Sequence, residues 1–289
     1  DGDLELSSIL AGAFDVSTSV YTQSFSVASQ ETIPHGIAFN TDGTKMFIVG
    51  PSGDDVNEYA LTTGFDVSTA SFTDSFSVGA QDTTPRDLAF NTDGTKMFVL
   101  GGTGDDVNEY SLSTGFDVST ATYTQLFSVA TQENLPKGFA FNTDGTKMFV
   151  VGGQGQDVNE YTLSTGFDVS TASFVDSFSV SAQDTAPWGL AFSTDGTKMF
   201  VVGTTGQDVN EYTLSTGFDV STASFVDSFS VSAQETSVAG LAFDTSGTKM
   251  FVVGYTTSDA VYEYDVGSFV STSGYNPVHT TASIDSTYW

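Results

Sequence analysis

Short stretches in which apolar residues alternate with polar ones, or run together, recur along the whole chain. In one representative segment they fall at residues 36–39, 45–49, 56–61 and 71–78, which we name strands A, B, C and D. Stretches of this length bounded by turn-forming residues are typical of β-strands. No stretch repeats its apolar residues with the 3.6-residue period of an amphipathic helix. The pattern therefore predicts an all-β protein.

The residues between these stretches favour tight connections. Asp42-Gly43 separates strands A and B, and this pair predicts a two-residue type I′ hairpin, in which both central residues have positive φ. Thr63-Gly64 and the segment from Phe65 to Thr69 separate strands C and D. Short polar side chains in such a connector can bond their own backbone. Neighbouring strands are therefore expected to pair in an antiparallel sheet.

The four-strand pattern is an internal repeat with a period of 51 residues, as from Phe39 to Phe90. The nine residues that begin at Phe39 return with the same leading residue at Phe90, Phe141, Phe192 and Phe243. Four short strands in a unit of this size are the signature of a β-propeller blade. A β-solenoid is the main alternative, but its coils are usually shorter and its turns less hairpin-like.

The order of the strands predicts five blades. An isolated D strand at residues 20–27 precedes four complete A–D sets, and a final A, B and C end near Val266. We therefore expect the N-terminal strand to complete the last blade and close the ring, which removes exposed sheet edges. If that strand completed a neighbouring molecule instead, the chain would polymerise. The predicted organisation is an extension at 1–13, a propeller at 14–266 and a tail at 267–289.

The motifs within each repeat resemble those of a known class of propellers. The sequence Asp-Gly-Thr-Lys-Met-Phe-Val-Val-Gly, followed by Asp-Val-Asn-Glu-Tyr, resembles YVTN-type and WD-type repeats. The whole unit is similar to repeat arrays of marine phage and environmental bacterial proteins. It lacks the Trp-Asp dipeptide and the Gly-His pair of WD repeats. The resemblance implies the fold and says little about function, because propellers host many unrelated activities.

Composition narrows the class of protein. The chain has 36 Asp and Glu against 7 Lys and Arg, a net charge of −29, and no Cys. Such a balance argues against binding nucleic acid or an anionic membrane surface, and no apolar run reaches membrane-spanning length. High negative charge keeps a protein dispersed in salty water. We expect an extracellular, cell-surface or virion-associated protein.

One column of the repeats collects the rarest residue types. Five of the seven basic residues are the lysines of the A–B hairpins, and the other two fall at the start of strand A. That column reads His35, Arg86, Lys137, Trp188 and Ala239 in successive repeats. In a propeller, strand A lines the central channel, so these side chains should converge at its mouth. With Tyr255 from a B–C loop, they are candidates for binding an anionic or aromatic group. The alternative is drift at an exposed loop.

The face that carries these residues should be formed by the D–A and B–C loops, where the repeats vary most. Paired acids in the B–C loops, at Asp54, Asp55, Asp105 and Asp106, could supply oxygen ligands for Ca²⁺. Ordinary turn chemistry explains them better, because the spacing of an EF-hand is absent. No other cofactor is expected. The glutamate of each C strand, such as Glu58, is interpreted as structural, with a hairpin lysine or backbone amides as its partner.

No catalytic constellation can be assembled from the sequence. His35 and His279 are the only imidazoles, and no phosphate-binding glycine loop precedes a helix. We therefore expect a non-catalytic module that binds a glycan or other surface polymer through the variable face. A protomer of an extracellular filament, assembled through its termini as a homo-oligomer, is the alternative. A hydrolase or lyase with its site at the channel mouth is the second alternative.

Overall fold

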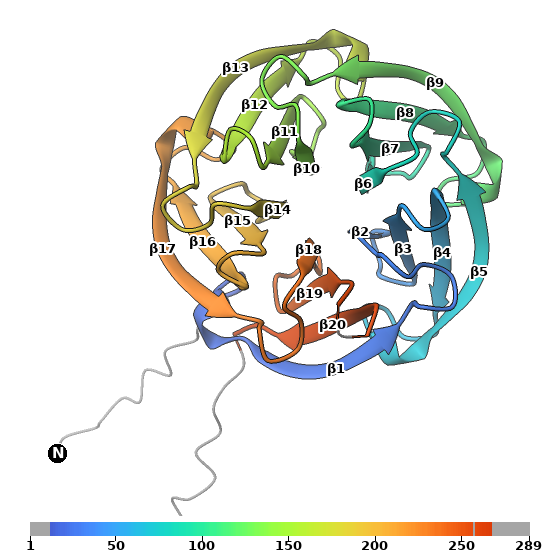
Figure 1. The fold of residues 1–289 in the computed structure, drawn as a ribbon, viewed down its shortest axis with the longest axis horizontal. Helices are drawn as coiled ribbons and strands as arrows, with labels where there is room; N and C mark the ends of the chain where they lie inside the picture. Colours follow the sequence, from blue (N-terminus) through green and yellow to red (C-terminus); the bar gives the residue numbers. More distant parts are fainter. Residues whose placement is uncertain (1–11, 257, 268–289) are drawn as a thin grey trace, which may run out of the picture.

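The computed structural model describes residues 12–256 and 258–267, which form five four-stranded antiparallel sheets around a central axis (Figure 1). The prediction of an all-β, five-bladed propeller is confirmed. Strands A of the five blades, namely β2, β6, β10, β14 and β18, lie innermost around the channel, and strands D lie outermost. No helix in the described residues is long and apolar enough to cross a bilayer.

Each blade follows the predicted strand order closely. Blade 1 comprises β2 (Gly36–Phe39), β3 (Lys45–Gly50), β4 (Asp55–Leu61) and β5 (Ala70–Ser77). Blade 2 comprises β6 (Pro85–Phe90), β7 (Lys96–Gly101), β8 (Asp106–Leu112) and β9 (Ala121–Ser128). Blade 3 comprises β10 (Pro136–Phe141), β11 (Lys147–Gly152), β12 (Asp157–Leu163) and β13 (Ala172–Ser179). Blade 4 comprises β14 (Pro187–Phe192), β15 (Lys198–Gly203), β16 (Asp208–Leu214) and β17 (Ala223–Ser230).

Blade 5 is completed by the N-terminus, as the sequence predicts. It comprises β18 (Val238–Phe243), β19 (Lys249–Gly254), β20 (Ala260–Asp265) and β1 (Val20–Ser26). Strand β1 pairs antiparallel with β20 of the same chain, so both ends of the propeller meet in one sheet (Figure 1). The predicted extension and tail lie almost wholly outside the described residues, and their role in assembly stays a prediction.

A short 3₁₀ turn comes just before each D strand, at η1 (Val16–Thr18), η2 (Val67–Thr69), η3 (Val118–Thr120), η4 (Val169–Thr171) and η5 (Val220–Thr222). The Asp66 side chain accepts the Ser68 N–H at 3.1 Å ahead of η2. This bond is the side-chain-to-backbone bonding expected of the connector.

The A–B hairpin differs from the prediction. Gly43 has φ of 71°, but Asp42 is not among the residues with positive φ, so the predicted type I′ turn is wrong. The loop instead contains a turn in which the Gly43 N–H donates to the Asn40 carbonyl. Asp42 accepts the N–H of Thr44 at 3.0 Å, and this local bond competes with the conformation that a type I′ turn requires. A Cβ on Gly43 would lie 2.3 Å from the Phe65 ring, which also excludes other residues.

The core lies between the blades. Phe47 of β3 packs on Phe90 of β6, with ring centroids 4.4 Å apart, and the buried residues group into five clusters around the ring. Because each cluster draws on two adjacent sheets, no blade buries its apolar faces alone. Burying one such Phe contributes about 2 kcal/mol.

Each blade is also tied to the next by a lysine–glutamate pair. Lys45 Nζ lies 2.7 Å from Glu58 Oε1, while Glu58 Oε2 accepts the Val118 N–H at 3.1 Å in the connector of blade 2. The Lys45 ammonium also donates to the Phe116 carbonyl of that connector. The same arrangement occurs in all five blades, which confirms the structural interpretation of these glutamates.

Breaking one of these ties should destabilise the ring measurably. Glu160→Ala leaves Lys147 without its carboxylate and the Val220 N–H without an acceptor. We expect a loss of about 2 kcal/mol in the free energy of unfolding, below the range for a fully buried pair because Lys147 is partly exposed. Urea unfolding would measure it against Ser173→Ala on an exposed strand. Equal stability of the two variants would contradict a structural role for Glu160.

Candidate functional site at the channel mouth

The D–A and B–C loops lie together on one face of the disc, and a buried acid joins them in each blade. In blade 3 the Glu133 carboxylate accepts the N–H of Leu135 in its own D–A loop at 2.7 Å. It also accepts the N–H groups of Gln154 and Gly155 in the B–C loop, at 3.2 and 2.9 Å. The sequence analysis missed these acids, which are Glu31, Asp82, Glu133, Asp184 and Glu235. Their recurrence every 51 residues beside a Gln or Thr was the available signal.

The candidate residues of the variable column meet where this face opens into the channel. The Trp188 ring lies 4.9 Å from the His35 ring and 6.2 Å from the Tyr255 ring, between centroids, and His35 and Tyr255 are 5.3 Å apart. These three rings come from blades 4, 1 and 5. We name them, together with Arg86 and Lys137, the mouth cluster. Ala239, the fifth member of the column, is buried.

Two cations from blades 2 and 3 complete the mouth cluster. Lys137 Nζ lies 4.2 Å from the Trp188 ring centroid and Arg86 Cζ lies 5.4 Å from it, so both make cation–π contacts. The Nε of Arg86 is buried without a hydrogen-bond partner. A buried N–H of this kind is costly unless an acceptor reaches it.

The electrostatics of the cluster follow from burial and mutual repulsion. Burial, and then the charge of Arg86, lowers the pKa of Lys137 to about 8. Burial likewise lowers the pKa of His35 to about 3, and Arg86 and Lys137 add to the effect. His35 is therefore neutral near pH 7, and its Nδ1 lies 3.4 Å from the Pro85 carbonyl, to which the Nδ1–H tautomer donates. It supports the rings and does not contribute charge.

The predicted calcium ligands do not form a cluster. No group of three or more His, Cys, Asp or Glu that could hold a metal occurs in the part of the chain that the structure describes. Asp106 accepts the Asn108 side-chain amide at 2.6 Å, while Asp54 and Asp105 occupy turn positions with φ of 54° and 49°. Asp55 begins β4. These observations fit turn chemistry, and a calcium site stays a prediction.

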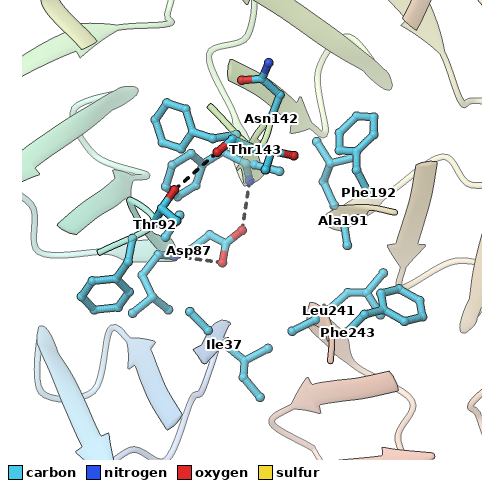
Figure 2. Close-up of a pocket in the computed structure, with 18 of the residues that line it drawn as sticks. Ile37, Asp87, Thr92, Asn142, Thr143, Ala191, Phe192, Leu241 and Phe243 are labelled. Carbon is cyan, nitrogen blue, oxygen red and sulfur yellow. Dashed lines mark hydrogen bonds between the residues drawn. The ribbon is translucent and has the colours of Figure 1, made fainter. Parts of the chain in front are cut away.

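A pocket of about 390 Å³ lies in the channel between the five A strands (Figure 2). It runs from Asp87, near the start of β6, to Asn142 and Thr143 in the A–B loop of the adjacent blade 3, and we name it the channel pocket. Its wall is formed largely by apolar side chains of the five A strands, including Ile37, Ala191 and Leu241, shown in Figure 2.

Asp87 is a further residue that the sequence analysis did not single out. The other four repeats carry glycine in its place, at Gly36, Gly138, Gly189 and Gly240, where a Cβ would lie 2.2 to 2.8 Å from the neighbouring blade. The Asp87 carboxylate accepts the N–H groups of Phe139 on the next blade, at 3.0 Å, and of Leu88, at 2.9 Å. Burial nevertheless raises its pKa to about 8. Comparing the column that follows the mouth residues would have revealed it.

Known structures share the fold of this protein. No protein-family model matches the sequence, and no curated protein sequence matches it. The luciferin-regenerating enzyme superposes with a TM-score of 0.52 at 13% identity, over 84% of this chain and 95% of that one. A functionally unknown Desulfotomaculum acetoxidans protein gives 0.49 at 16% identity over 76% of this chain, which spans 65% of its length. A candidate 6-phosphogluconolactonase from Bacteroides uniformis gives 0.49 at 13%, over 84% and 68%.

At these identities the likeness shows the propeller fold. The predicted resemblance to propeller repeats therefore holds at that level, without a matching YVTN or WD family. The prediction that the protein is not an enzyme is contradicted, because the luciferin-regenerating enzyme has the same fold, which therefore accommodates an enzyme. That prediction relied on the scarcity of His and Cys. It treated Lys137 only as a ligand-binding residue and did not consider Asp87, although the pKa values of both lie near 8, where acid–base groups operate.

Proposed function

We propose that the mouth cluster binds an anionic ligand with a flat or apolar ring, such as a carboxylate- or sulfate-bearing sugar of a surface polymer. The observation that carries this is the unsatisfied Nε of Arg86, which lies with Lys137 beside the Trp188 ring. Neither cation belongs to an ion pair with an acid in the described residues. A bound anion would supply the missing acceptor and charge.

The rest of the cluster suits such a ligand. Trp188 and Tyr255 offer apolar ring surface, on which sugar rings and aromatic groups stack. The molecule as a whole is strongly acidic, so this cationic mouth is a local exception that would select where an anion binds. An extracellular, cell-surface or virion-associated location fits a polymer ligand and is part of the proposal.

Hydrolysis of an ester of such a ligand is a second candidate function. Lys137 favours it, since a pKa of about 8 leaves a fraction of the side chain as neutral amine near neutral pH. That amine could accept a proton from the water that attacks the ester carbonyl. The resulting ammonium could return the proton to the leaving oxygen as the tetrahedral intermediate collapses, so that the products are the acid and the alcohol. Arg86 could stabilise the oxyanion that forms.

Binding of hyaluronan oligosaccharides, with dextran oligosaccharides as the neutral control, tests the proposal. Calorimetry at low ionic strength should show binding only of the acidic oligosaccharides. Lys137→Met, Arg86→Gln and Trp188→Ala should each weaken it about tenfold or more. Ser173→Ala, on an outer strand, should not change it. Equal binding of neutral and acidic chains, or unchanged affinity in all three variants, would refute an anion site.

The pH dependence separates the two candidates. Anion binding should weaken from pH 7 to 9 as Lys137 loses its proton, whereas hydrolysis with Lys137 as base should accelerate over the same range. Release of acid from methyl-esterified oligosaccharides would measure the second. Release that is unchanged in Lys137→Met would exclude Lys137 as the base.

A further inference from the structure

The channel pocket differs from the mouth cluster in both shape and charge. Of the residues that line it, Asp87 is the one ionisable side chain, and the remainder are Ile, Leu, Ala, Phe, Thr and Asn. Its volume of about 390 Å³ lies within the usual range for small-molecule sites, which are mostly apolar with a few polar groups.

Asp87 is an exception among the five repeats, and the propeller fold does not require a carboxyl at this position. Four repeats close the same position with glycine, so the fold is satisfied without a carboxyl there. Burying an ionisable carboxyl is costly unless a partner compensates it. Residues that cost stability and occur once in a repeated framework are expected at functional sites.

We propose that the channel pocket binds an apolar organic cation whose charged nitrogen pairs with Asp87. Each carboxylate oxygen already accepts one backbone N–H and keeps a further lone pair for a ligand (Figure 2). The partly buried Phe90, Phe192 and Phe243 also line the pocket and add to the apolar wall against which the organic part of such a cation would pack.

Charge around the pocket favours a cation over an anion. The A–B loops at this end carry the aspartates Asp42, Asp93, Asp144 and Asp195, and the hairpin lysines there are paired with glutamates. The acidic A–B end of the pocket therefore favours a cation, while Asp87 itself lies at the other end, next to Arg86 in β6.

Binding should depend on pH through Asp87. Its carboxyl has to lose a proton to pair with a cation, and its pKa is about 8. Other charged groups on adjoining elements are Arg86 beside it in β6, Lys137 in β10, His35 before β2, and Lys45 and Lys96 at the starts of β3 and β7. Lys45 and Lys96 are ion-paired, and neutral His35 does not titrate near pH 8. Lys137 loses charge near pH 8, which strengthens cation binding in the same direction.

Phenyltrimethylammonium, whose charge is independent of pH, and its uncharged isostere tert-butylbenzene are suitable probes. Ligand-detected NMR with the full chain should show saturable binding of the cation, at least tenfold tighter at pH 8 than at pH 6. Asp87→Asn should weaken cation binding at least tenfold and remove Asp87's share of the pH dependence, while binding of tert-butylbenzene changes little. Asp176→Asn, which removes an exposed acid on the outer strand β13, should behave as the wild type.

Asp87→Gly, which restores the residue of the other repeats, provides a second variant in case the asparagine does not fold. It should also lose cation binding. The proposal is overturned if phenyltrimethylammonium does not bind the wild-type protein, or binds it no better than tert-butylbenzene. It is equally overturned if Asp87→Asn and Asp87→Gly bind the cation as the wild type does. None of these outcomes bears on the mouth cluster, whose test uses anions.

Discussion

Deletion of residues 1–27 should prevent the chain from forming a stable monomer. The deletion removes β1, exposes the edge of β20, and takes away Val16 and Val27, which are fully buried. It also removes Phe14, which packs on Phe200 and Phe243. The buried side chains alone represent about 5 kcal/mol or more, a large share of the 5–15 kcal/mol that stabilises a typical domain.

Two measurements should show that the deleted protein no longer forms a stable monomer. Size-exclusion chromatography with light scattering should show aggregates or strand-exchanged oligomers, because the free edge of β20 can pair with another chain. Thermal unfolding should lose its cooperative transition. A synthetic peptide of residues 12–27 should restore much of that transition when added to the deleted protein. A monomer with an unchanged Tm would mean that β1 does not close the ring.

The sequence alone predicted most of this fold because the repeat supplies the same evidence five times. Strand A at 36–39 matches β2, and the predicted B, C and D strands end within one residue of β3, β4 and β5. The A–B turn was misjudged because Asp42-Gly43 favours a type I′ turn only when no side chain offers a competing bond. Here Thr44 and the Phe65 ring select another conformation, and Phe65 is 22 residues away in sequence.

The sequence predicted the candidate site only in part. The mouth cluster stood out because rare residue types fill one column, and strand A lines the channel of every propeller. The buried acids such as Glu133 were not predicted, since their partners are backbone amides that only the folded loops bring together. Asp87 was missed because its significance depends on the spacing between neighbouring A strands, which a sequence does not state.

Asp87→Gly should change how stability depends on pH. The pKa of Asp87 is raised from 3.8 to about 8 by burial, so the folded protein holds a proton that the unfolded chain releases above about pH 4. Stability contributed by the protonated carboxyl is therefore complete below pH 4 and is lost as pH rises towards 8. Relative to pH 4, the variant should gain at least about 2 kcal/mol over the wild type at pH 8.

Urea unfolding of both proteins at pH 4, 6 and 8 would measure the difference between their free energies of unfolding. The contributions of all other acids cancel in this difference because both proteins contain them. The pH-independent cost of a more flexible glycine, about 1 kcal/mol, shifts the whole curve without changing its slope. Asp93→Asn is the matched control, because hydrogen bonds from Thr95 lower the pKa of that exposed carboxyl. The pH-dependent part of the effect of Asp93→Asn on the free energy of unfolding should therefore be confined to acidic pH. It should have the opposite sign to that of Asp87→Gly, because the wild type gains stability as Asp93 ionises. A difference between wild type and Asp87→Gly that stays constant from pH 4 to 8 would show that Asp87 is ionised throughout. The carboxylate would then already be compensated in the channel by the N–H groups of Phe139 and Leu88.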